Sequence, residues 1–450
     1  MSYQSAVEQL YHLGHELAQT PSHKFDLAHM RVLLGALGDP QGRFRSVLIA
    51  GTNGKGSTAA TLASILRTAG HKTGLYTSPH LVSINERIRN SEDGRQISQD
   101  EFAAAYERVE AAAQKLVSAG SLPWHPSFFE MLTAIAFSHF AEQKVAIAVL
   151  EVGMGGRLDA TNVVEPLVSV ITDISLDHQK FLGNTIAEIA FEKAGIIHPN
   201  GLLVTLPQHP QANDVIGKAV MERNATAVSA VQYMPPVSPG TEGTAWETQA
   251  GARNRYPLTV MGKEIAVDSP LIGRHQLRNI ALAIATAAQL DRLGIRVSAD
   301  DIERGIRDTE WPGRFQVIAA TPNSPEIVMD VAHNPAGAWA LRSALSERYE
   351  DRRITMVFGV LRDKAVSEIA EILFPVADTV VATHVENPRS ASPEEIIAAG
   401  SRTGASIIAK ADFASAMEKG FHVAMQNPGG LLVITGSIYT VGAASAWLRA

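Results

Sequence analysis

An apolar run passes into a glycine-rich turn with one lysine and three hydroxyl side chains at residues 47–58, VLIAGTNGKGST. Such a turn lets backbone N–H groups surround phosphate oxygens, while the helix that follows points its positive end at the same anion. Lys55 would reach the distal phosphates, and the Ser57 hydroxyl would contact Mg²⁺. The spacing departs from the G-x-x-x-x-G-K-[ST] pattern, because Ile49 stands at the first glycine position and Gly56 separates the lysine from the serine. The segment predicts a phosphate site, although turns with several glycines are also common in α/β proteins that bind no nucleotide.

Four further polar residues could do chemistry: Ser78 in TSPH, Glu151 in LEVG, His178 in LDH and Lys193 in EKAGI. Each also has an ordinary structural interpretation. The serine could form a turn before its proline, the glutamate could cap a neighbouring helix, the histidine could be a satisfied core residue, and the lysine is most simply a solvated helix residue. A nucleotide-bound Mg²⁺ favours hard oxygen ligands and takes few of them from protein. Glu151 could supply a carboxylate, and Ser57 and Ser78 could supply hydroxyls.

The elements that must position these residues are apolar strand-like runs that alternate with helical patterns, as in a mostly parallel sheet covered by helices. After the loop, strands are expected at 72–77, 144–150 and 167–172, and helices at 58–69, 101–118, 128–141, 185–197 and 276–293. The polar candidates fall near strand ends, where open α/β sheets place their sites. Residues 233–256, rich in Pro, Gly, Thr and Ala, predict a loop or an irregular β excursion.

At 450 residues the chain is too long for one ordinary core, so two or more domains are expected. The sequence Glu310-Trp311-Pro312-Gly313 interrupts the pattern near residues 309–314, and a second series of strands follows at 326–329, 354–358, 379–383 and 431–435. The sequence therefore predicts an α/β protein with a large P-loop ATPase domain, residues 1–309, around a mostly parallel sheet. A smaller, Rossmann-like α/β domain would occupy residues 310–450.

Composition excludes several classes of protein. With 46% hydrophobic and 19% charged residues, the composition is typical of a globular protein rather than of a disordered or fibrous one. It contains no apolar run of about 18 residues that would predict a membrane helix, and its first twenty residues do not resemble a secretory signal. The absence of cysteine rules out disulfides and thiolate sites, and a net charge of −7 disfavours a nucleic-acid surface. We expect a cytoplasmic protein that binds neither nucleic acid nor membrane.

Seven motifs occur in one order, at residues 51–58, 77–81, 151–162, 177–178, 192–196, 312–314 and 330–335. Together they resemble folylpolyglutamate synthase, including the bacterial bifunctional dihydrofolate synthase form, within the superfamily of ATP-dependent Mur ligases. The resemblance extends from about residue 25 to residue 439, and its strongest single piece is the string EVGMGGRLDATN at 151–162.

The resemblance implies specific roles for matching positions. ATP contacts would come from Gly54, Lys55, Gly56, Ser57, Thr58, Asn279, Arg314 and Asp330, with the asparagine on the adenine side. Two Mg²⁺ ions would lie among Ser57, Ser78, Glu151 and His178, and K⁺ is a further candidate cation. In related enzymes the lysine that matches Lys193 is carbamylated by CO₂, which gives it a carboxylate-like charge. The implied catalytic residues are Lys55, Glu151, Asp159, His178, Lys193 and His333.

The implied substrates are dihydropteroate or a folate, together with L-glutamate, and the implied enzyme is a monomer. The pterin would contact Lys24, Phe25, Asp26, Leu27, Ser127, Phe128, Phe129, Glu130, Leu158, Asp159 and Ala160. His333 and Ser437 would lie on the amino-acid side. The reaction would transfer the γ-phosphoryl group of ATP to a carboxylate, and the amine of glutamate would then displace phosphate from the acyl phosphate.

Three alternatives stay open at this point. A folylpolyglutamate synthase without dihydrofolate synthase activity would share the same ATP chemistry. A peptidoglycan Mur ligase would carry an additional N-terminal nucleotide-sugar domain, for which a loop that begins at residue 47 leaves little room. A regulatory module would bind ATP without ligation, but it would not explain why candidate metal ligands and a later Asp/His motif accompany the loop.

Overall fold

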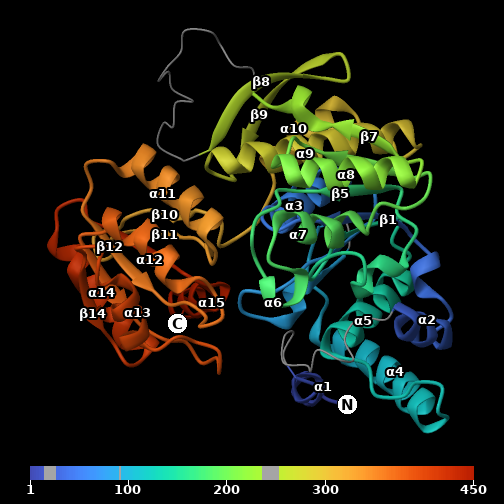
Figure 1. The fold of residues 1–450 in the computed structure, drawn as a ribbon, viewed down its shortest axis with the longest axis horizontal. Coiled ribbons are helices and arrows are strands. Elements are labelled where there is room, and N and C mark those ends of the chain that lie inside the picture. The colour runs from blue at the N-terminus through green and yellow to red at the C-terminus, as the bar shows by residue number, and fades with distance from the viewer. Residues whose placement is uncertain (15–26, 91–92, 236–252, 450) are drawn as a thin grey trace.

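The computed structural model describes residues 1–14, 27–90, 93–235 and 253–449. Figure 1 shows two α/β units, one coloured blue to yellow and the other orange to red, joined by the segment that follows α10. Within the described part of the chain, no helix is long and apolar enough to cross a membrane.

The first unit is built on a seven-stranded sheet in the order β3-β2-β4-β1-β5-β6-β7, with only β3 antiparallel to its neighbour. Its strands are β1 (Arg45–Ala50), β2 (Thr73–Tyr76), β3 (Ile88–Arg89), β4 (Ile147–Glu151), β5 (Val168–Ile171), β6 (Leu202–Thr205) and β7 (Thr226–Ser229). The register places Ile49 of β1 beside Glu151 of β4, so the candidate carboxylate lies next to the strand that enters the phosphate loop.

Helices cover both faces of this sheet. They are α1 (Tyr3–His12), α2 (Leu27–Ala36), α3 (Lys55–Thr68), α4 (Gln99–Ser118), α5 (Phe128–Glu142), α6 (Gln179–Leu182), α7 (Ile186–Ala194), α8 (Pro210–Glu222), α9 (Arg274–Arg292) and α10 (Ala299–Arg307). Short 3-10 helices are η2 (Pro40–Gly42), η3 (Ile84–Arg87), η4 (Ala160–Val163) and η5 (Ala230–Tyr233), and a hairpin joins β8 (Asn254–Val260) to β9 (Lys263–Ser269).

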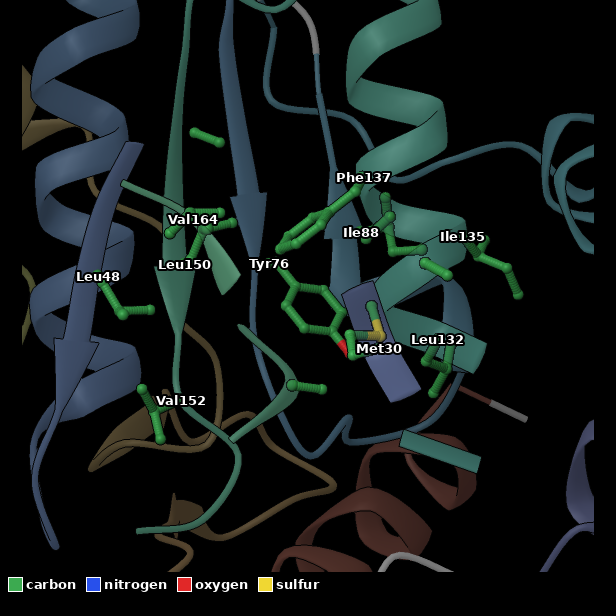
Figure 2. Packing of buried hydrophobic residues seen from close by; sticks show 14 of the residues in the cluster. Met30, Leu48, Tyr76, Ile88, Leu132, Ile135, Phe137, Leu150, Val152 and Val164 are labelled. Carbon is green, nitrogen blue, oxygen red and sulfur yellow. The ribbon is translucent and has the colours of Figure 1, made fainter. Parts of the chain in front are cut away.

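Alternate residues of the central strands pack into two separate cores. On β1, Leu48 and Ala50 face the core formed with α1, α2, α4, α5, α7 and α8, whereas Val47 and Ile49 face the core formed with α3, α9 and α10. Figure 2 shows the first core, where Tyr76 of β2 packs beside side chains of α5. Both faces are buried, which is why these strands read as continuous apolar runs.

The second unit is built on a six-stranded sheet in the order β10-β11-β15-β12-β13-β14, parallel except for β10. Its strands are β10 (Gln316–Ile318), β11 (Glu326–Met329), β12 (Ile354–Phe358), β13 (Thr379–Ala382), β14 (Ser406–Ala409) and β15 (Leu431–Thr435). Its helices are α11 (Pro335–Tyr349), α12 (Val366–Leu373), α13 (Pro393–Gly400), α14 (Phe413–Gln426) and α15 (Ile438–Trp447), with a short 3-10 helix η6 (Phe374–Val376).

The predicted fold class is confirmed: both sheets are mostly parallel and both units are α/β. Differences lie at element ends. Helix α3 begins at Lys55 rather than at residue 58, because Gly54 adopts a left-handed φ of 89° and starts the helix one turn earlier. Strands β3, β6, β7, β9, β10 and β14 were not predicted; β6 is an interior strand, and β7 and β14 are partly exposed strands at the sheet edges. Part of the predicted β excursion is the start of β8, and residues 236–252 lie outside the described part.

Candidate active site

A cavity of about 480 Å³ lies between the two units, at the carboxyl ends of their central strands. The first unit contributes the loops that follow β1, β4 and β5, and the second contributes the loops that follow β11, β12 and β15. Parallel strands end at one edge of a sheet, so the two sheets present their site-bearing loops to each other.

Close backbone packing shapes the phosphate loop. A Cβ atom at Gly54 would lie 2.1 Å from Oδ1 of Asn279 on α9, so only glycine fits there. The loop is fastened to the end of β5, where the backbone N–H groups of Thr52 and Asn53 donate to the carbonyl of Asp173. The hydroxyl of Thr172 also donates to the carbonyl of Asn53 (2.8 Å). The amino end of α3 therefore faces the cavity in a fixed position, which favours an anion there.

Two lysines converge on one carbonyl of this loop. Lys55 Nζ donates to the carbonyl of Gly51 (3.2 Å) and to that of Thr52 (3.3 Å), and Lys193 Nζ donates to the Gly51 carbonyl at 2.7 Å. The expectation that Lys193 is a solvated helix residue is wrong, since it is buried on α7 beneath the loop. Burial, with the charge of Lys55 as a smaller cause, lowers the pKa of Lys193 to about 7.

The close approach of α7 to the neighbouring turn explains this burial. A Cβ atom at Gly195 would lie 2.2 Å from Cβ of Arg157, and the backbone N–H of Arg157 donates to the carbonyl of Glu192 (2.8 Å). In the sequence, Gly156 and Gly195 were the only local indication that Lys193 is buried. Glycine at both positions lets the backbone of the turn approach the backbone of α7.

Oxygen donors gather at the ends of β2 and β4. Glu151 is buried at the last position of β4, and its Oε2 accepts a hydrogen bond from the backbone N–H of Ser78 (3.2 Å). Ser57, Ser78 and Glu151 all line the cavity. The described residues contain no group of three or more acidic or histidine side chains placed to hold a metal. This donor set therefore fits a Mg²⁺ ion that takes its remaining ligands from phosphate and water, as nucleotide-bound Mg²⁺ does.

Asp177 is one of the points where the second unit contacts the first. Its Oδ1 accepts hydrogen bonds from Lys364 Nζ (2.7 Å) and from the backbone N–H of His178 (2.8 Å). Its Oδ2 accepts one from Asn334 Nδ2 (3.1 Å) and lies 3.5 Å from His333 Nε2. Burial alone would raise the pKa of Asp177, but the His333 hydrogen bond and the charge of Lys364 hold it well below its usual range. The carboxylate is therefore charged.

The loop that follows β11 also contacts the phosphate loop. Asn334 Nδ2 donates to Oδ1 of Asn53 (3.0 Å), while its own Oδ1 caps α11 by accepting from the N–H of Gly337 (2.8 Å).

Burial, followed by the charge of Lys364, lowers the pKa of His178 to about 3, so its imidazole is neutral and able to bind a metal. Sequence reasoning assigned no role to Asp177, Asn334 or Lys364. The first two lie within the recognised motifs, but Lys364 has no local signal.

Two charged groups, Asp330 and Arg314, line the cavity on the second unit's side. Asp330 accepts hydrogen bonds from the backbone N–H groups of Phe315 (2.8 Å) and Ala332 (2.9 Å). Burial raises the pKa of Asp330, although His275 and Arg314 oppose that shift. Burial lowers the pKa of Arg314, and the charges of Asp330 and Glu151 oppose it. Arg314 therefore lines the cavity from the segment between the units, and the negative charges of Asp330 and Glu151 offset its positive charge.

The other wall of the cavity is largely apolar. Ser127 and Glu130 form a capping box at the start of α5, which directs Phe128 and Phe129 into this region. A Cβ atom at Gly153 would lie 2.5 Å from the ring of Phe129, so the β4 turn packs directly on that ring. Asp159 is buried close by. Burial raises its pKa, although hydrogen bonds from Thr161 and the backbone oppose this shift.

The structure brings nearly all of the predicted site residues together. Those that line the cavity are Leu27, Gly54, Lys55, Gly56, Ser57, Ser78, Ser127, Phe128, Phe129, Glu130, Glu151, Leu158, Asp159, Ala160, His178, Lys193, Asn279, Arg314, Asp330, His333 and Ser437. Thr58 does not line it, because its side chain is fully buried beneath the loop. Lys24, Phe25 and Asp26 lie outside the described residues.

Comparison with known proteins agrees with this architecture. Residues 49–287 match the Mur ligase middle domain, and residues 313–438 match the Mur ligase, glutamate ligase domain. The dihydrofolate synthase/folylpolyglutamate synthase of Mycobacterium tuberculosis (strain ATCC 25618 / H37Rv) is 36% identical over 475 residues, covering 97% of this chain and 93% of that protein. This chain belongs to the dihydrofolate synthase/folylpolyglutamate synthase family of Mur ligases.

Other members of the family are similarly close to this chain in sequence or in structure. The dihydrofolate synthase/folylpolyglutamate synthase of Bacillus subtilis (strain 168) is 34% identical over 377 residues, covering 82% of this chain and 83% of that protein. Among solved structures, Mycobacterium tuberculosis folylpolyglutamate synthase complexed with ADP and AMPPCP superposes with a TM-score of 0.86 at 33% identity, covering 100% of this chain and 99% of the other. E. coli FolC in complex with DHPP and ADP superposes with a TM-score of 0.83 at 28% identity, covering 100% and 98%.

The pKa of Lys193 predicts how its replacement changes stability with pH. Between about pH 7 and the usual lysine pKa of 10.5, the unfolded chain binds more protons at this residue than the folded one, so its contribution to stability rises with pH. Lys193→Met removes that dependence. We expect the variant to melt at a higher temperature than the parent at pH 6, with an advantage that shrinks towards pH 10.

The measurement is the melting temperature in bicarbonate-free buffer across that pH range. Lys218→Met, at an exposed lysine of α8, is the matched control and should shift the melting temperature equally at every pH. A Lys193→Met advantage that does not change with pH would contradict the prediction.

Proposed function

We propose that this protein is an ADP-forming ligase that joins the amine of L-glutamate to the carboxylate of dihydropteroate, of a folate, or of both. The observation that carries the proposal is the shared cavity, in which a phosphate loop, oxygen donors for Mg²⁺ and a cationic second unit face an apolar wall. That wall suits a flat pterin, and the charged side suits ATP. The names of the family members support the same substrates.

The first step activates a poor electrophile. A carboxylate oxygen of the acceptor attacks the γ-phosphorus of ATP, the bond to the bridging oxygen breaks, and ADP leaves with that electron pair. Lys55, Arg314 and the amino end of α3 offset negative charge on the phosphoryl oxygens, which is catalysis by position and electrostatics. Ser57, Ser78, Glu151 and His178 would hold Mg²⁺, which when bound neutralises further charge on those oxygens. Asn279 and Asp330 provide the remaining contacts to the nucleotide, with Asn279 on the adenine side.

The second step forms the amide. The free amine of glutamate attacks the acyl carbon, loses a proton, and the tetrahedral intermediate expels inorganic phosphate. No protein nucleophile is required. Water must stay out because an acyl phosphate hydrolyses readily, and the Asp177 contacts to Lys364, Asn334 and His333 hold the second unit over the first. Ser437 lies on the same side of the cavity as His333 and serves the amino acid.

Lys193 takes a carbamate in this proposal. Its neutral amine attacks the carbon of CO₂ and releases one proton, which converts the uncharged amine into a carbamate anion able to support a second Mg²⁺. Two structural facts favour the reaction. The amine is held by the Gly51 carbonyl close to Lys55, whose charge would pair with a carbamate, and its lowered pKa leaves much of it unprotonated near pH 7.5.

Several finer points belong to the same proposal. The protein is a cytoplasmic monomer, and the two domains comprise residues 1–309 and 310–450. Asp159 lies against the pterin pocket and orients the acceptor. The proposed site does not include the K⁺ ion that the resemblance implied, because no feature of the described site indicates it.

The test of the proposal is ligation by the purified protein with ATP, Mg²⁺ and L-glutamate. We expect ADP release when 7,8-dihydropteroate or tetrahydrofolate is added, and a product heavier by one glutamyl residue in mass spectrometry. Reaction of tetrahydrofolate alone would restrict the enzyme to chain extension. ATP binding without turnover of either acceptor would refute the proposed function.

The charge-compensating groups predict large losses of turnover. Lys55→Ala and Glu151→Ala should each lower ligation by at least about 10³-fold, because both act on charge that develops during phosphoryl transfer. Circular dichroism should show an unchanged fold. Lys218→Ala and Glu222→Ala, at an exposed ion pair of α8, are the matched controls and should keep full activity. Retained turnover in either site variant would show that the assigned roles are wrong.

The carbamate predicts a requirement for CO₂. Removal of bicarbonate from the buffer should suppress ligation and its return should restore it, with the response fading below about pH 7 as the amine becomes protonated. Lys193→Arg cannot form a carbamate and should be inactive with or without bicarbonate. Carbon-13 NMR with labelled bicarbonate should show a carbamate signal in the parent alone. Equal activity in both buffers, without that signal, would exclude the modification.

A further inference from the structure

Trp311, in the segment between the two units, packs directly on the phosphate loop helix. A Cβ atom at Gly56 would lie 2.8 Å from Cζ2 and 3.2 Å from Cε2 of the indole. The indole is rigid, so even one methyl group at position 56 would force the ring or the helix to move. Gly56 stands between Lys55 and Ser57, in the first turn of α3.

A cation holds the indole ring as well. The guanidinium carbon of Arg89 lies 5.6 Å from the centroid of the Trp311 ring, within range of a cation–π contact. Burial lowers the pKa of Arg89, while the charges of Glu86 and Glu310 oppose that shift. Gly56 and Arg89 therefore both restrict where the ring can lie.

The chain on each side of Trp311 is fixed by short contacts. Upstream, a Cβ atom at Gly305 of α10 would lie 2.4 Å from Cα of Ile65, so α10 packs against the backbone of α3 itself. Downstream, the carbonyl of Gly313 accepts a hydrogen bond from the N–H of Val331 (3.1 Å) in the second unit. Arg314, the next residue, enters the cavity.

We propose that Trp311 is a positioning residue that keeps Arg314 in register with the phosphate loop, and that position 56 must be glycine because the indole fills the space of its side chain. The inference rests on the proposed function, in which the loop and Arg314 hold the same phosphate chain from two sides. It also explains why a glycine separates Lys55 from Ser57. A misplacement of about 1 Å in such a site can lower turnover by about 10²-fold.

The test is a double-mutant cycle in the full-length protein. Gly56→Ala should lower kcat/KM for ATP by about 100-fold, because the loop and Arg314 no longer align on the bound nucleotide. Trp311→Leu frees the space, so Gly56→Ala combined with Trp311→Leu should recover at least about tenfold over Gly56→Ala alone. Trp311→Phe keeps a flat ring and should stay within about threefold of the parent.

Two substitutions control for general effects. Gly217→Ala, on α8 with open space around it, should leave activity unchanged, and so should Trp447→Leu on α15, where the indole packs on Phe421. ADP affinity, measured by calorimetry, should show the same loss and recovery without any need for ligation. A parent protein that binds ADP but does not ligate would therefore refute the proposed function while leaving this test in place.

Two outcomes would overturn the inference. Full activity and ADP affinity of Gly56→Ala would show that the indole does not fix the loop. No recovery in the double variant, with unchanged circular dichroism, would show that the glycine serves the phosphates themselves rather than Trp311.

Discussion

The buried carboxylate of Asp177 is the interaction on which the site depends. It accepts from Lys364 and Asn334 of the second unit and lies beside His333, so one charge of the first unit organises three side chains of the second. A buried charge is tolerated only when its partners surround it, and loss of one partner is costly. These contacts help to hold the carboxyl ends of the two sheets towards each other, on either side of the cavity.

Close approach of backbones is the second constraint, and glycine makes it possible. Gly54 admits Asn279, Gly56 admits Trp311, and Gly195 admits the turn at Arg157. As a result, the Gly51 carbonyl of the loop accepts hydrogen bonds from two lysines, the half-buried Lys55 and the buried Lys193. Such packing makes chemistry available to Lys193 that a solvated lysine would lack, because burial removes the water that stabilises its charge.

Much of the fold could be predicted because buried parallel strands are apolar on both faces. The strands at 326–329, 354–358 and 431–435 were predicted with their exact bounds. The interior strand β6 was missed along with the edge strands β7 and β14, where partial exposure weakens the apolar pattern. Most predicted site residues came together in one cavity, but the family resemblance, rather than periodicity, named Asn279 and Arg314 among them. The burial of Lys193 was misjudged because it depends on contacts with residues over a hundred positions away.

The sequence by itself determined the phosphate loop, the order of the motifs and the α/β class, because these follow from local glycine geometry and from hydrophobic patterns along the chain. Only the tertiary structure decided which side chains share a charge environment. Lys364 carries no local signal, yet it pairs with Asp177 across 187 positions of sequence. Trp311 likewise looked like a simple interruption between domains and instead fills the space above Gly56. Charge pairing and steric exclusion act through space, so they become defined only when distant segments are brought together.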